Sequence, residues 1–350
     1  MFRSVFAADI GSRNTRLALD SGCRTEPTLI ALSAAQTLRV KAVGTAALAE
    51  PGARIAPVRE GTVANTRLLA LLLSEFAREH TGRRAMQSID FCAALPKLLP
   101  ALKLNAFRRT AQLAGFHSFR VLNSSLLGAI GAGVDVFAEK AAMVVDIGAE
   151  TVRLAVIASG GLLFESAENF GSTEIDRAIR NHFLADHRVM IGSRMAEIIK
   201  QRIDNPTFVI DGRSAESGLP CSVRADCAEL RTAADAAIGP VLRLITDAVR
   251  TIQPDAAADL LENGITLIGG GARFSGIAEH FSRSLGVPVR TAENAETAVA
   301  EGMRRYLFLD RSLAGRLRPD FMDAADLPFR EREAGARRTA HAAERFAVYI

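Results

Sequence analysis

The sequence predicts an α/β protein built from two similar halves, and three observations carry this prediction. The segment 8–19 returns as 145–156, with six of twelve positions identical. Strand-like and helix-like segments alternate along the chain, which implies a largely parallel sheet in each half, covered on both faces. The chain has 350 residues, too many for one ordinary core, so it suits two domains of about 150 residues each.

The duplicated segment predicts two β-hairpins. Each copy runs from an apolar strand into Asp-Ile-Gly, then a small polar turn, then a strand with alternating apolar residues, which puts Asp9 and Asp146 near the two tips. Backbone N–H groups at such glycine turns can approach phosphate oxygens, and the nearby carboxylate can hold a hydrated Mg²⁺. The structural alternative for either aspartate is a turn-capping residue.

A third element strengthens the phosphate-site hypothesis. The apolar strand 265–268 ends in Gly269, Gly270 and Gly271, and we expect the chain to enter a helix after them. Such a turn lets backbone lie flat against a nucleotide, and the helix N-terminus presents free N–H groups. A glycine triplet alone is more often a plain turn, but the order hairpin, hairpin, triplet favours a nucleotide site.

The remaining elements follow from hydrophobic periodicity and breakers. In the first half, strands are predicted at 5–10, 15–19, 28–32, 38–43 and 89–95, and helices at 68–79, 105–115 and 126–133. Glycines in the last of these helices predict close packing. In the second half, helices are predicted at 174–183, 194–203 and 227–252, a strand at 207–210, and loops at 211–213 and 217–220.

Composition excludes several classes of protein. Hydrophobic content is 49%, aromatic content is 6% and Trp is absent, so Leu, Val, Ile and Ala must build the core. The longest apolar run, 68–73, is too short to span a bilayer, and the N-terminus enters a strand without a leader, so we expect a cytoplasmic protein. Four cysteines lack Cys-x-x-Cys spacing and a paired His, which argues against zinc or disulfides.

The net charge of +4 does not indicate a nucleic-acid partner. Only five of the 43 basic residues are Lys, the Arg residues are scattered, and no nucleic-acid motif accompanies them. Nucleic-acid binding is therefore disfavoured. The tail beyond residue 309 is rich in Arg and broken by prolines, which predicts disorder or short helices.

In this order, the motifs resemble the superfamily of actin, heat-shock chaperones and sugar kinases. Over residues 4–309 the chain resembles the MreB family of bacterial actin homologues, which organise cell-wall synthesis. The segments that carry this resemblance are 9–15, 55–61, 129–133, 144–148, 191–200, 211–213 with 217–220, and the glycine triplet.

The resemblance implies an actin-like (ribonuclease H-like) duplicated two-domain fold with a central nucleotide cleft and small insertions in each half. Domain I would comprise 1–145 and 297–309, with an insertion at about 27–60. Domain II would comprise 146–296, with an insertion at about 177–246, and 310–350 would form an Arg-rich tail. The implied function is a nucleotide-dependent cytoskeletal filament at the inner membrane face, contributing to cell shape.

The resemblance also implies a site for ATP and Mg²⁺. Asp9 and Asp146 would hold Mg²⁺ through water. Glu197 and Lys200, which share a helix face, would flank the adenine and ribose, with an exposed surface ion pair as the alternative. The nucleotide-binding set would be Gly11, Ser12, Arg13, Asn14, Gly148, Gly171, Ser172, Glu197, Lys200, Gly269, Gly270 and Gly271.

Two departures from the family affect catalysis. Where the family has Glu-Glu-Pro, this chain has Asn123-Ser124-Ser125, so Ser124 replaces the acid that positions the attacking water. Where the family has Gly-Gly-Gly-Thr, this chain has Gly148-Ala149-Glu150-Thr151. If that turn needs positive φ, Ala149 and Glu150 cost about 1 kcal/mol each. Ser124 and Glu150 are the catalytic candidates, and we expect slow or absent hydrolysis.

Two other functions stay open from the sequence. A sugar or metabolite kinase of the same superfamily would need a carboxylate base aimed at a substrate hydroxyl, and none can be placed. A non-hydrolysing scaffold is the other alternative. The expected partners are further copies of the chain, with cell-wall morphogenesis proteins and a membrane surface as additional candidates. Phe2 and Phe6, which flank Arg3, and the Arg-rich tail are the candidates for membrane contact.

Overall fold

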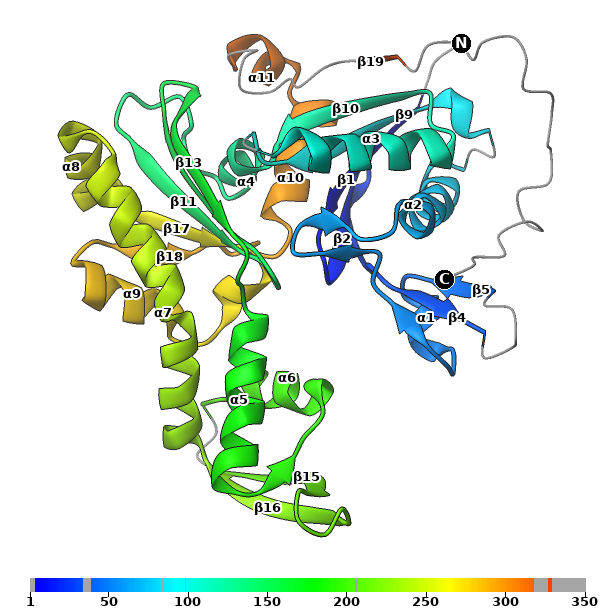
Figure 1. Ribbon diagram of the computed structural model, residues 1–350. Coiled ribbons are helices and arrows are strands. Elements are labelled where there is room, and N and C mark those ends of the chain that lie inside the picture. The colour runs from blue at the N-terminus through cyan, green and yellow to red at the C-terminus, as the bar shows by residue number, and fades with distance from the viewer. Residues whose placement is uncertain are drawn as a thin grey trace. The chain divides into compact units, whose positions relative to one another are not determined.

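The computed structural model describes residues 4–33, 39–82, 85–97, 99–204, 207–317 and 327–328 and divides into two compact units (Figure 1). Unit 1 comprises Met1–Ala138, Ser159–Glu165 and Thr297–Ile350, and unit 2 comprises Glu139–Ala158 and Ser166–Glu296. Relative to the predicted domains, unit 2 starts earlier and a short segment after its second strand belongs with unit 1. In the described part of the chain, no helix is both long and apolar enough to cross a membrane.

Unit 1 is built on a mixed sheet in the order β19-β10-β9-β1-β2-β3. Strand β1 is parallel to β9 and antiparallel to β2, so the largely parallel sheet that we expected is wrong. The third strand of the meander, β3, occupies residues for which the periodicity predicted no strand. The bounds are β1 Ser4–Ile10, β2 Asn14–Leu19, β3 Gly22–Pro27, β9 Ile89–Leu95, β10 Ser118–Asn123 and β19 Leu327–Pro328.

One face of this sheet carries the large core side chains. Phe6, Ala8 and Ile10 alternate along β1 and pack with leucines of α2 (Thr66–Thr81) and Phe107 of α3 (Ala101–Ala114). Phe6 is fully buried and stacks on Phe116 with ring centroids 5.8 Å apart. Its role as a membrane candidate is therefore wrong, because its ring lies inside unit 1. Phe2 and Arg3 lie outside the described residues.

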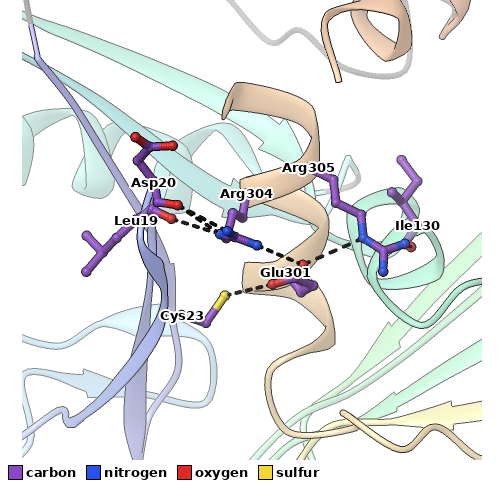
Figure 2. A network of polar contacts seen from close by, with 7 residues as sticks. All are labelled: Leu19, Asp20, Cys23, Ile130, Glu301, Arg304 and Arg305. Atoms are coloured by element: carbon purple, nitrogen blue, oxygen red, sulfur yellow. Dashed lines mark hydrogen bonds and ion pairs between the residues drawn. The ribbon is translucent and has the colours of Figure 1, made fainter. Parts of the chain in front are cut away.

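The other face carries small residues, which lets a helix lie close to it. Ala7, Ala18 and Cys23 are register partners across β1, β2 and β3, so they share one face. The Cys23 thiol donates a hydrogen bond of 3.4 Å to Glu301 on α10 (Ala298–Arg304), as Figure 2 shows. In the same network Arg304 donates to the carbonyl oxygens of Leu19 and Asp20 (Figure 2).

Helix α4 (Ser124–Gly131) crosses α10 at two glycines. A Cβ on Gly131 would collide with the backbone of Ala298, and a Cβ on Gly302 would collide with that of Leu127. Arg305 adds a hydrogen bond at this crossing, since it donates to the carbonyl oxygen of Ile130 at 3.0 Å (Figure 2). The close packing predicted for the glycine-containing helix is confirmed.

A small insertion of short strands extends from β3. Asn65 caps α2 by accepting hydrogen bonds from the backbone N–H groups of Arg67 and Leu68, so α2 begins earlier than predicted. Glu60 and Gly61 both have positive φ and form the two-residue turn between β7 and β8. The elements are β4 Ile30–Leu32, β5 Val40–Val43, α1 Ala46–Ala49, β6 Arg54–Ile55, β7 Val58–Arg59, β8 Thr62–Val63 and η1 Met86–Ser88.

Unit 2 is organised around a second mixed sheet, in the order β13-β12-β11-β17-β18, of which the part of β13 up to Glu165 is assigned to unit 1. Strand β11 is antiparallel to β12 and parallel to β17, which repeats the arrangement of β1 with β2 and β9. The strands are β11 Ala142–Ile147, β12 Val152–Ala158, β13 Gly161–Glu168, β17 Ile265–Ile268 and β18 Val289–Thr291. The helices are α5 Thr173–Asp186, α6 Ser193–Gln201, α7 Cys227–Thr251, α8 Pro254–Asn263 and α9 Ile277–Leu285.

A three-stranded sheet, β14-β15-β16, forms the insertion of unit 2. Strand β15 (Thr207–Ser214) runs through Asp211, Gly212 and Arg213, so the loop predicted there is wrong. Pairing with β16 (Pro220–Asp226) extends the strand beyond what its apolar residues indicate, and Pro220 itself begins β16. The short β14 spans Val189–Met190.

The chain beyond residue 309 begins with ordered structure. After a π-helical turn, η3 (Arg305–Leu309), helix α11 spans Arg311–Arg316. The Arg316 guanidinium lies 3.8 Å from the centre of the Phe137 ring, and Leu317 is buried. Helix α11 agrees with the short helices predicted for 310–350, and the rest of that segment after Leu317, apart from 327–328, lies outside the described residues.

Candidate nucleotide site

The first predicted phosphate loop is a tight hairpin turn in unit 1. The N–H of Gly11 donates to the carbonyl oxygen of Asn14 at 3.0 Å. A Cβ on Gly11 would lie 2.8 Å from that same oxygen, so close approach across the turn requires glycine. At the tip, the Ser12 hydroxyl accepts from the N–H of Gly61 at 3.5 Å, which ties the loop to the β7–β8 hairpin.

The second loop, in unit 2, repeats the first. The N–H of Gly148 donates to the carbonyl oxygen of Thr151 at 2.9 Å, and a Cβ on Gly148 would lie 2.9 Å from it. The two predicted hairpins are thereby confirmed as equivalent structures. Neither Ala149 nor Glu150 has positive φ, so the backbone cost considered for them does not arise. What distinguishes this loop is the charge of Glu150 rather than strain.

Each aspartate expected to serve the metal faces an arginine. Asp9 is the register partner of Arg16, and Asp146 is that of Arg153. An arginine Nη1 lies 3.6 Å from Asp9 Oδ2 and 3.3 Å from Asp146 Oδ2, with all four side chains largely buried. The sequence analysis missed these pairs, although both arginines are among the repeated positions.

The start of α5 packs on the second loop. The N–H of Ser172 donates to the carbonyl oxygen of Gly148 at 2.9 Å, and both the N–H and the hydroxyl of Thr173 donate to that of Ala149. A Cβ on Gly171 would lie 2.6 Å from the Ala149 oxygen. Of the residues that the resemblance assigns to the phosphates, Gly148, Gly171 and Ser172 are thus close together within unit 2.

The glycine triplet lies against the same hairpin. Gly269 has a φ of 84°, and a Cβ there would collide with the Asp146 carboxylate. A Cβ on Gly271 would collide with Ile147, whereas Gly270 is exposed. The helix predicted after the triplet is present in two pieces. A short 3₁₀ turn, η2 (Gly270–Arg273), begins within the triplet, and α9 begins at Ile277.

Lys200 of α6 joins this group. Its Nζ lies 2.8 Å from Asp176 Oδ1 on α5, and it donates to the Ser172 carbonyl oxygen at 3.4 Å. Its side chain is only 12% exposed, so Lys200 is not part of an exposed surface ion pair. Glu197 lies one helical turn earlier on α6, half-buried.

In unit 1, the turn that replaces the family's acids is occupied by structural contacts. The Asn123 side chain caps α4 by accepting from the N–H of Leu126 at 2.8 Å. Ser124 is 1% exposed, and its hydroxyl has no hydrogen-bond partner among the described residues. Ser125 donates to Glu165 at 2.7 Å. No sequence signal indicated Glu165, because β13 brings it to this turn from a distant part of the chain.

Comparison with known proteins identifies the family. The family described as MreB/Mbl protein matches residues 3–313. The chain belongs to the MreB/Mbl family. Cell shape-determining protein MreB of Escherichia coli (strain K12) is 28% identical over 321 residues, covering 86% of this chain and 92% of that protein. Cell shape-determining protein Mbl of Bacillus subtilis (strain 168) is 26% identical over 317 residues, covering 86% and 95%.

Solved structures share the fold of this MreB/Mbl family member. MreB5 of Spiroplasma citri bound to ADP has a TM-score of 0.80 and 25% identity, covering 87% of this chain and 96% of that chain. The MamK double helical filament has a TM-score of 0.73 and 20% identity, covering 86% and 97%, a likeness of fold alone. The predicted actin-like fold and the resemblance to MreB are confirmed.

Proposed function

We propose that this MreB/Mbl family member binds ATP and assembles into filaments that contribute to cell shape. The family match across residues 3–313 carries the proposal, because it spans both phosphate hairpins and the glycine triplet. The relatives' names support it: MreB and Mbl are called cell shape-determining proteins, MreB5 is described as bound to ADP, and MamK as a double helical filament.

Each group of residues has a proposed part in binding the nucleotide. The tip of the first hairpin, Gly11–Asn14, together with Gly148, Gly171 and Ser172, serves the phosphates through backbone N–H groups and short side chains. Glu197 and Lys200 serve the adenine and ribose. The exposed Gly270 supplies flat backbone for the nucleoside, while Gly269 and Gly271 keep that backbone against the hairpin.

Asp9 and Asp146 supply carboxylate oxygens, the donors that Mg²⁺ prefers, so the donor set fits a hydrated Mg²⁺. A bound Mg²⁺ would neutralise phosphate charge. Arg16 and Arg153 hold one oxygen of each carboxylate at 3.6 and 3.3 Å, which orients the aspartates. The same arginines bring fixed positive charge to both hairpins, and we propose that they lower the dependence of binding on the metal.

We further propose that hydrolysis is slow. A water in line with the γ-phosphate needs a group that positions it and accepts its proton. At the turn that would supply this group, Asn123 is used as a helix cap and Ser124 is buried. Glu150 of the second loop is the candidate that remains for this role.

Association with cell-wall morphogenesis proteins and with a membrane surface is part of the same proposal. The burial of Phe6 removes that side chain from the candidates for lipid contact, which leaves Phe2 and the Arg-rich tail. Liposome co-sedimentation of the full chain and of a truncation after Leu317 tests the tail. The truncation should keep α11 and its contact with Phe137 intact. Equal pelleting of both proteins excludes the tail.

Sedimentation with and without ATP and Mg²⁺ tests the main proposal. We expect the pelleted fraction to rise with ATP, and electron microscopy of the pellet to show filaments. A protein that binds ATP but stays in the supernatant at every concentration would instead be a monomeric scaffold. Phosphate transfer to a small metabolite, without pelleting, would indicate a kinase.

A further inference from the structure

A cluster of metal-ligating side chains lies in unit 2, at the ends of two neighbouring helices. His182 is four residues before the end of α5 at Asp186, His187 follows the end of that helix, and Glu229 is in the first turn of α7. Each offers one ligand atom, and these atoms all lie within 4.8 Å of one another. The two imidazole rings are 5.5 Å apart and nearly perpendicular.

Both histidines carry a buried nitrogen that the protein leaves unsatisfied. The Nε2 atoms of His182 and His187 are buried, and within the described ranges neither has a hydrogen-bond partner. The side chain of His182 is only 11% exposed. A buried polar atom without a partner costs free energy. Two such atoms in one cluster are therefore explained most simply by one ligand that both contact.

The other ring nitrogen of His182, Nδ1, already pairs with Asp186. This Nδ1 lies 2.7 Å from Asp186 Oδ2, which keeps the proton of the neutral ring on Nδ1. The Nε2 lone pair is then available, and it lies 3.7 Å from Glu229 Oε2. A carboxylate behind a histidine is the arrangement that orients metal-binding imidazoles in proteins and raises their basicity.

We propose that His182, His187 and Glu229 bind a divalent transition-metal ion, with Zn²⁺ as the occupant whose chemistry fits best. Two imidazoles and one carboxylate form a three-ligand zinc set, with solvent in the fourth position. Bonds of about 2.0 Å require neighbouring ligand atoms to be about 3.3 Å apart. The Glu229 side chain is 63% exposed and free to close the remaining distance.

The bound ion would join the end of α5 to the start of α7. These helices lead into and out of the insertion that carries β14, β15 and β16. The site shares no residue with the hairpins, the glycine triplet or the other residues of the proposed nucleotide site.

Cobalt titration of untagged, chelator-treated full-length protein tests the site. We expect one Co²⁺ per chain, with the visible absorption of a four-coordinate site, displaced by Zn²⁺. His182→Gln and His187→Gln should each weaken binding about 100-fold, because each removes one of the three protein ligands. Asp186→Asn should weaken it about 10-fold through the orientation of His182.

His280→Gln is the matched control, since it removes a histidine of unit 2 that lies on α9, outside the cluster. Its affinity should equal that of the wild type. Absence of the absorption band, or an unchanged band in the His182→Gln/His187→Gln double variant, would overturn the proposal. X-ray absorption of the zinc-loaded wild type gives a test without variants. Two imidazoles and no sulfur are expected, and sulfur ligands would assign the metal to cysteines instead.

Discussion

At the scale of single residues, the three glycines of the triplet have different structural roles. Gly269 and Gly271 have no room for a side chain, because a Cβ would meet Asp146 or Ile147 of the second hairpin. Gly270 is exposed and has negative φ. The motif therefore combines residues that hold the loop with one that is available to a ligand.

Replacing Gly270 by Leu should abolish measurable ATP binding and leave the unfolding temperature unchanged, because Gly270 is exposed and lies in the segment proposed to contact the nucleoside. Equilibrium binding of a fluorescent ATP analogue and circular dichroism measure the two effects. Gly269→Ala is the contrasting variant and should lower the unfolding temperature, since its φ of 84° strains an L-residue. Unaltered ATP affinity in Gly270→Leu would contradict the assignment.

Cys23 is a second residue whose surroundings set its chemistry. Burial, with the hydrogen bond to Glu301 and the repulsion of that carboxylate, raises the pKa of the Cys23 thiol to about 12 (Figure 2). Because the thiol binds its proton more tightly in the native state than in the unfolded state, protonated Cys23 stabilises the native state. The corresponding stability is complete below the unfolded value of 9.0 and is lost as the pH rises toward about 12.

Cys23 should therefore resist iodoacetamide at pH 8, since the thiolate is the reacting form. Glu301→Gln should accelerate its alkylation, because the variant removes the repelling charge. Mass spectrometry of tryptic peptides over time measures both rates, with Cys221 of the same sample as the internal reference. Equal Cys23 rates in wild type and Glu301→Gln would show that the carboxylate does not control this thiol.

At the scale of elements, hydrogen bonds from side chains connect the short insertions to the sheets. Glu26 on β3 is 5% exposed and accepts from the N–H and the hydroxyl of Thr45 at 3.0 and 2.7 Å, beside the start of α1. Arg24 donates to its other oxygen at 3.1 Å. Burial raises the pKa of Glu26, but the hydrogen bonds from Thr45 and Arg24 together lower it by more than burial raises it, so the net shift is downward.

Glu26→Gln should lower the free energy of unfolding at pH 7 by about 1.5–3 kcal/mol, the range for hydrogen bonds to a charged group. A lowered native pKa contributes stability above the unfolded value of 4.5, and this contribution is lost as the pH falls through the native pKa. The difference between wild type and variant should therefore shrink in acid. Urea unfolding at pH 7 and pH 4 measures it.

Glu79→Gln serves as the control for that comparison. Glu79 also pairs with Arg24, at 3.5 Å, but its side chain is 57% exposed, so its loss should change the stability by less than about 0.5 kcal/mol. A Glu26→Gln difference that persisted unchanged at pH 4 would exclude the carboxylate charge as its source.

At the scale of the whole molecule, one hairpin design serves two units. In each, a glycine turn follows an aspartate that faces an arginine across the pair of strands. The units differ in what surrounds the turn. Unit 1 adds Gly61 of the β7–β8 hairpin, whereas unit 2 adds the start of α5 and the glycine triplet.

For the proposed enzyme activity, we expect very slow phosphate release from ATP. Glu150→Gln should raise the affinity for ATP several-fold, because it removes a negative charge from the second loop without altering a strained backbone. If Glu150 also orients the water, the same variant should abolish the residual turnover. Calorimetric binding and a coupled phosphate assay measure the two effects.

Glu279→Gln, on the surface of α9, removes an equal charge outside the hairpin and should change neither quantity. Fast turnover that is unaffected by Glu150→Gln would locate the catalytic group elsewhere.

Ser124→Glu should lower the unfolding temperature, because it buries a carboxylate at a position that is 1% exposed.

The sequence by itself determined the two hairpins, the glycine turns and most of the helices, because turn chemistry and hydrophobic period are local. Tertiary structure decided what depends on distant partners. Pairing with β16 made 211–213 a strand, stacking on Phe116 buried Phe6, and packing of α6 on α5 joined Lys200 to Asp176. Packing of α7 on α5 brings Glu229 to His182, and β13 brings Glu165 to Ser125. No periodicity indicates such contacts, since they depend on how helices and strands pack together.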